Sequence, residues 1–160
     1  MIEDQLLREH LLELLGGSHA HLNFEKATAD MPIELSGVKP ASLPYTVWQL
    51  VEHMRIAQWD ILQFSINPRH ISPDFPKGYW PSETAPPSRE RWDQSLTAFR
   101  ADLKATMSLV ADPKTDLLTP LPHGQGQTIL REVLLVADHN AYHLGQLVTV
   151  RRLLGAWQEI

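Results

Sequence analysis

The chain has 160 residues and a formal net charge of −5, and 43% of its residues are hydrophobic. It contains no cysteine, which excludes disulfide scaffolds, cysteine-ligated zinc sites and a cysteine nucleophile. No cationic cluster exceeds the pair Arg151–Arg152, and no uncharged apolar run reaches membrane-spanning length, so we expect neither a nucleic-acid partner nor a membrane partner. The length and composition predict one globular domain over residues 1–160 and favour a cytoplasmic protein.

The first predicted helix covers residues 3–30. Leu7, Leu11 and Leu14 recur at helical spacing, and Pro32 ends the pattern. The pair Gly16–Gly17 interrupts it, and we expect a kink there. Beyond the kink the same line carries polar residues, including His21.

The second predicted helix covers residues 46–66. Thr46 and Gln49 have the spacing of a capping box, and Asn67–Pro68 ends the helix. His53 lies in the middle of this helix among apolar residues. The proline-rich loop that follows, residues 67–88, carries Phe75, Tyr79 and Trp80, so we expect it to pack on the helices and to have a functional role.

Two more helices are predicted over residues 88–111 and 128–154. Ser88 is a candidate cap for the first of them, and Gly155 is a candidate C-terminal cap for the second. Four helical patterns without a strand pattern predict an all-α four-helix bundle with long loops between its helices. The loops before and after the second helix are long enough for parallel neighbours.

The last helix carries a pattern that points to metal chemistry. His139 and His143 lie four residues apart, so their side chains share one helix face and can bind one ion. The zinc-protease motif would place a glutamate after the first histidine, but the chain has Asn140 there, which excludes that interpretation. A third ligand must come from another helix, and His53 is the best candidate. Three imidazoles with an open position are typical of a catalytic site and suit zinc, nickel, iron or copper.

Other side chains are candidates for supporting roles. A ligating histidine commonly donates its second N–H to an acceptor, and four side chains are within reach by helical spacing: Asp60, Glu132, Asp138 and Gln146. Three residues are candidates for acid–base or substrate contacts: His21, Glu132 and Tyr142. We interpret His123 as a loop residue, His10 and His70 as surface residues, and Gly145 as a point of close approach by another helix or a partner chain.

The chain resembles the DinB/YfiT-like family in "WQLVEHMRIAQWDIL" and "HNAYHLGQL", and the likeness extends over nearly the whole chain. The resemblance implies an up-up-down-down four-helix bundle, often dimeric, with a metal site formed by His53, His139 and His143. Some members of this family depend on a low-molecular-weight thiol, such as the bacillithiol S-transferases and the mycothiol-dependent maleylpyruvate isomerases.

Three hypotheses for function follow. The first is a metal-dependent enzyme, a thiol S-transferase or a hydrolase, that acts on a small molecule and takes any thiol from solution. The second is a metal-binding or ligand-binding bundle without turnover, which serves as a sensor or buffer. The third is a dimeric bundle in which the histidines satisfy one another without metal.

Overall fold

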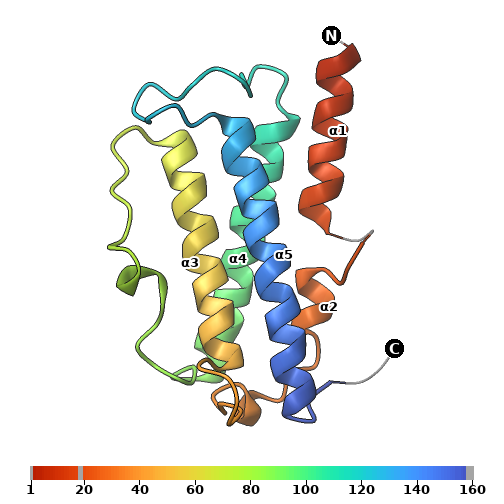
Figure 1. Cartoon of the computed structure of the whole chain (residues 1–160), viewed down its shortest axis with the longest axis vertical. Coiled ribbons are helices and arrows are strands. Elements are labelled where there is room, and N and C mark those ends of the chain that lie inside the picture. The colour runs from red at the N-terminus through yellow and green to blue at the C-terminus, as the bar shows by residue number, and fades with distance from the viewer. Residues whose placement is uncertain (1, 18–19, 158–160) are drawn as a thin grey trace.

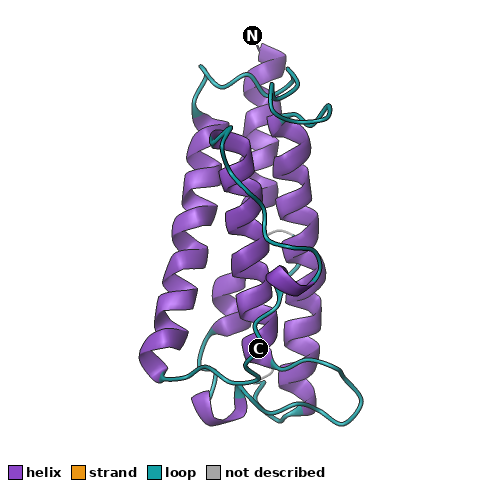
Figure 2. Ribbon diagram, turned by 90° about the vertical axis from the view of Figure 1, so that its left-hand side faces the viewer, coloured by secondary structure: helices purple, strands orange, loops and turns teal. Residues whose placement is uncertain are grey.

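The protein is built from helices joined by loops, and the computed structural model describes residues 2–17 and 20–157 (Figures 1 and 2). Five α-helices lie within these residues: α1 (Ile2–Gly16), α2 (Phe24–Thr28), α3 (Val47–Ile66), α4 (Arg89–Ala111) and α5 (Ile129–Leu153). Two short 3₁₀ turns cover Ile33–Leu35 and Lys77–Tyr79. The described residues form no strand, which confirms the predicted all-α fold.

The long helices run down, up, up and down in the view of Figure 1. Trp48 and Trp92, each near the start of its helix, lie 6.3 Å apart between ring centroids, so α3 and α4 are parallel. Arg8 of α1 donates to the carbonyl of Val110 near the end of α4, so these two helices are antiparallel. The parallel consecutive pair is therefore α3 and α4, which differs from the up-up-down-down order that the resemblance implied.

The connection between α3 and α4 makes this parallel arrangement possible. Residues 67–88 run along the outside of the bundle from the end of α3 back to the level of its start (Figure 2). At that level the hydroxyl of Thr46 donates to the carbonyl of Thr84 at 2.6 Å. The long loop thus lies against the same helix that carries His53.

Side-chain caps define the starts of the three longest helices. Thr46 and Gln49 form the predicted capping box in both directions, each side chain accepting from the other residue's backbone N–H. Ser88 caps α4 by accepting from Arg91, and Thr128 caps α5 in the same way. These caps confirm the predicted helix starts because the hydroxyls satisfy N–H groups that the helices cannot pair internally.

The prediction that residues 3–30 form one helix is wrong. Helix α1 ends at Gly16, and Gly17 has a φ of 61°, a left-handed conformation that ends helices and that glycine adopts without steric cost. A separate helix, α2, begins at Phe24, where the Asn23 side chain accepts from the backbone N–H of Lys26 at 3.0 Å. The glycine pair therefore breaks the helix completely instead of kinking it.

Two apolar clusters form the core of the bundle, and neither includes the three histidines. One cluster joins α2 to α3, α4 and α5, and its buried members include Phe24, Trp48, Leu50, Phe99 and Leu147. The other joins α1 to the far ends of α4 and α5 through Leu11, Leu15, Val110, Val133 and Val136. Among the described residues, no helix has the length and apolar character needed to span a membrane.

We expect the Thr46→Ala variant to unfold with a free energy about 1–2 kcal/mol lower than the wild type. The change removes the helix cap and leaves the Thr84 carbonyl without its donor. Urea denaturation measures the difference, and Thr46→Ser, which keeps the hydroxyl, serves as the control. A loss equal in both variants would contradict the assigned role of the hydroxyl.

Candidate metal centre

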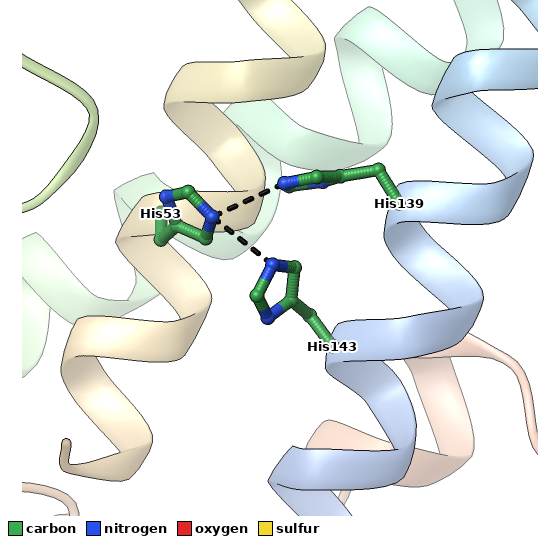
Figure 3. Close-up of side chains that lie close together, drawn as sticks. All are labelled: His53, His139 and His143. Atoms are coloured by element: carbon green, nitrogen blue, oxygen red, sulfur yellow. Dashed lines mark hydrogen bonds between the residues drawn. The ribbon is translucent and has the colours of Figure 1, made fainter. Parts of the chain in front are cut away.

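Three histidine side chains point toward one another between α3 and α5 (Figure 3). The Nε2 atom of His53 lies 3.1 Å from the Nε2 atom of His139 and 3.1 Å from that of His143. One ring nitrogen of each residue lies within 4.8 Å of the other two, a separation at which they could hold one ion. The structure thus brings together the three residues that the sequence nominated as ligands.

The other ring nitrogens of two histidines determine where the protons lie. Nδ1 of His53 donates to the backbone carbonyl of Tyr79 at 2.8 Å, and Nδ1 of His143 donates to the Gln146 amide oxygen at 2.7 Å. With Nδ1 protonated, each neutral ring presents an Nε2 lone pair. Two lone pairs therefore face each other at 3.1 Å, a repulsive arrangement that a cation between them would relieve.

Burial keeps these imidazoles neutral. It lowers the pKa of His53 to about 4, an effect only partly opposed by the hydrogen bond to Tyr79. It also lowers the pKa of His139 to about 3, with further contributions from the neighbouring histidines. The pKa of His143 is lowered by burial as well. Near neutral pH all three rings are therefore in the deprotonated form that binds metals.

A family model supports the interpretation that this geometry suggests. The model of the DinB superfamily matches residues 18–147, which is most of the chain. The chain belongs to the DinB superfamily. No curated protein and no solved structure matches the sequence at a significant level. Membership in the superfamily and the three-histidine group together fit a metal-binding DinB-like protein.

A segment of the long loop covers one side of the centre in this DinB-superfamily protein. We call residues 70–80 the strap. The ring of Trp80 stacks on His53 with centroids 3.9 Å apart and an interplanar angle of 4°. Together with the Tyr79 carbonyl, this ring gives His53 two contacts with the strap, which confirms that the loop packs on the helices.

The strap is attached to α3 by one buried carboxylate. Asp60 accepts from Nε2 of His70 at 2.7 Å and from the hydroxyl of Tyr79 at 2.6 Å. Burial, followed by the bond to Asp60, raises the pKa of Tyr79 to about 12, so its hydroxyl stays protonated. The prediction that His70 is a surface residue is wrong, because its side chain is only 7% exposed. Sequence patterns did not reveal this contact because it joins a helix to an irregular loop.

The four side chains that the sequence placed within reach of the histidines have different positions. Gln146 bonds directly to His143, as described above. Asp60 does not bond to His53 directly but is linked to it through Tyr79, which bonds to both. Glu132 is buried and accepts from Arg131 at 2.7 Å, and Asp138 is exposed.

The remaining candidates lie at the edge of the centre or away from it. Tyr142 is 65% exposed, and its ring lies 5.0 Å from that of His143. His21 is exposed and donates to the Leu22 carbonyl, and the three-histidine group found among the described residues does not include it. His123 lies in a loop and hydrogen-bonds the carbonyl of Phe64, and His10 is exposed, as predicted.

The space beside Gly145 is open in the part of the chain that the structure describes. A Cβ atom at this position would meet nothing within 4 Å among the described residues, so the expected close approach of another helix is wrong here. Approach by a partner chain stays a prediction.

The lowered histidine pKa values predict how the metal-free protein responds to acid. Unfolded imidazoles take up protons near pH 6.5, whereas His53 and His139 in the fold stay neutral down to about pH 4 and pH 3. The contribution of these two imidazoles to stability is therefore constant above about pH 6.5 and falls below it, by at most about 1.4 kcal/mol per pH unit for each imidazole.

Urea titrations of chelator-treated protein between pH 5 and pH 7.5 measure this slope. The double variant His53→Gln, His139→Gln should have a smaller slope than the wild type, with a variant of the exposed His10, His10→Gln, as the matched control. An unchanged slope in the double variant would mean that these two imidazoles are not held neutral by the fold.

Proposed function

We propose that this DinB-superfamily protein holds one divalent transition-metal ion on His53, His139 and His143 and uses it to act on a small molecule. The observation that carries the proposal is the pair of unprotonated Nε2 atoms on His53 and His143, held 3.1 Å apart by the hydrogen bonds of the Nδ1 atoms. Three neutral imidazole donors suit zinc, nickel, iron or copper. Three protein ligands also leave a position for a substrate.

The proposed reaction class follows from the ligand set and the composition. A metal ion on three imidazoles supplies acidity to a coordinated thiol or water, which makes a nucleophile available at neutral pH. The chain has no cysteine, so a thiol would be a low-molecular-weight cosubstrate. We therefore propose a thiol S-transferase or a hydrolase that acts on an electrophilic small molecule.

The residues around the centre have separate roles in this proposal. The Tyr79 carbonyl and Gln146 keep the Nε2 lone pairs of His53 and His143 directed at the ion. Trp80 shields one face of His53 from water. In this proposal the exposed phenol of Tyr142, whose ring lies beside that of His143, donates a hydrogen bond to an oxygen of the substrate.

A second candidate function is metal or ligand binding without turnover, as in a sensor or buffer. The observation that favours it concerns the buried carboxylates of the described residues nearest the histidines in sequence. Glu52 is paired with Arg55 and Arg91, Asp60 accepts from His70 and Tyr79, and Glu132 accepts from Arg131. None of these three carboxylates bonds to a histidine of the centre, so none of them serves as a general base there.

Three further expectations concern the oligomeric state, the cellular location and nucleic-acid binding. The homodimer, the cytoplasmic location and the absence of a nucleic-acid partner stay predictions of the sequence and of the family resemblance.

We expect the untagged protein to bind one equivalent of Zn²⁺ or Ni²⁺, and His53→Ala, His139→Ala and His143→Ala each to weaken binding by more than about 100-fold. Loss of a ligand should exceed the 10–100-fold effect of losing an outer hydrogen bond. Calorimetric titration and elemental analysis measure affinity and stoichiometry, with His10→Ala and His123→Ala as matched controls. Full metal content in all three ligand variants would exclude this centre.

Turnover separates the two candidate functions. We expect the metal-loaded protein to transfer a low-molecular-weight thiol to an electrophile, or to hydrolyse an ester or amide, and chelation or His139→Ala to reduce the rate to that of the uncatalysed reaction. A panel of thiols and chromogenic substrates measures this. Stoichiometric metal binding without turnover across the panel would support the binding function instead.

A further inference from the structure

Asp60 is a buried carboxylate that does not touch the metal centre but is linked to it by one residue. It lies seven residues after His53 on α3, about two helical turns along the same side of the helix. Its two oxygens accept from two donors of the strap, Nε2 of His70 and the hydroxyl of Tyr79. These donors lie at the beginning and near the end of the strap, so a single carboxylate holds both ends.

Tyr79 connects this anchor to the ligand. Its hydroxyl is bound by Asp60 at 2.6 Å, and its backbone carbonyl accepts from Nδ1 of His53 at 2.8 Å. The next residue, Trp80, stacks on the ring of His53. Both contacts that the strap makes with His53 therefore depend on the position of Tyr79, which Asp60 determines through the hydroxyl.

We infer that Asp60 is a positioning residue of the metal centre. Through Tyr79 it holds the carbonyl that keeps the proton of His53 on Nδ1, and this directs the Nε2 lone pair of His53 toward the ion. The effect of Asp60 on metal binding rests on the proposed function. The protonation state of His53 is a property of the protein without metal.

A carboxylate accepts from both donors at once at this position. Each oxygen of an ionised aspartate is an acceptor, whereas an asparagine of the same size offers one acceptor and one N–H₂ donor. In Asp60→Asn the amide N–H₂ would face either His70 or Tyr79, and that side chain would have to turn from donor to acceptor to keep the contact. This nearly isosteric change removes the charged acceptor and weakens the anchoring of the strap without removing any atom that packs.

The first test is made without metal. Long-range ¹H–¹⁵N NMR of the chelator-treated protein reports which ring nitrogen of His53 carries the proton. We expect the Nδ1–H form to dominate in the wild type, and the Nε2–H form to become populated in Asp60→Asn and in Tyr79→Phe. The second variant removes only the hydroxyl and keeps the ring and the backbone carbonyl, so it tests the link even if Asp60→Asn fails to fold.

The second test is metal affinity. We expect the Kd for Zn²⁺, measured by competition with a chromogenic chelator, to rise about 10–100-fold in Asp60→Asn and Tyr79→Phe, as for the loss of an outer hydrogen-bond partner. Two matched controls should leave both readouts unchanged. Asp116→Asn alters an exposed carboxylate that binds Thr119 in another loop, and Tyr45→Phe removes a hydroxyl from a ring that also lies beside Trp80.

The outcomes separate this inference from the proposed function. If the wild type binds no metal, the proposed function fails, and the NMR comparison still decides whether Asp60 controls the proton of His53. If both variants keep the wild-type protonation of His53 or the wild-type affinity, the inference is overturned. A lower melting temperature alone would assign Asp60 to loop anchoring and would overturn it too.

Discussion

The hydrogen bond from Nδ1 of His53 to the carbonyl of Tyr79 joins the fold of this protein to its chemistry. It requires that the loop between α3 and α4 return along the outside of α3, and this return in turn makes α3 and α4 parallel. The same bond keeps the proton of His53 on Nδ1, the ring nitrogen that faces the loop. The other nitrogen, Nε2, then has a free lone pair that faces α5. This contact therefore links the path of the chain to the position of the proton on one side chain.

The polar centre is compatible with a stable bundle because most of the apolar burial occurs elsewhere. One apolar cluster packs around Phe99 and Trp48, and the other packs around Val110 and Val133. The imidazoles between α3 and α5 are buried as neutral rings, which avoids the much larger free-energy cost of burying charged ones. The bundle can therefore keep three imidazoles together, with the Nε2 lone pairs of His53 and His143 facing each other, without depending on them for its core.

Two buried polar side chains next to the centre, Gln58 and Asn140, are hydrogen-bonded to each other, and Oδ1 of Asn140 accepts no bond from the described residues. Gln58 donates to the Phe99 carbonyl and accepts from Asn140, which lies beside His139 in sequence. The pairing gives a structural role to the amide of Asn140, which stands where the zinc-protease motif would have a glutamate. Asn140 is directed into the core toward Gln58, so it holds α5 against α3 and is not available as a base at the metal centre.

Local chemistry made several features predictable from the sequence. A threonine or serine hydroxyl caps the helix that follows it, so the starts of α3, α4 and α5 could be read from Thr46, Ser88 and Thr128. The spacing of His139 and His143 places both on one helix face in any fold. By contrast, the pattern over residues 3–30 could not distinguish a kink from a break, since both are compatible with the apolar spacing before Gly16 and the polar line after Gly17.

The sequence by itself therefore determined the helical class, three helix starts and the pair of histidines on α5, because each depends on interactions within a few residues. Only the tertiary structure decided the direction of α4, the buried side chain of His70 and the open space beside Gly145 among the described residues. It also decided that His53 meets His139 and His143, which lie 86 and 90 positions away in the sequence. Those features depend on how distant segments pack, and a hydrogen bond between Asp60 and the strap has no signature in local spacing.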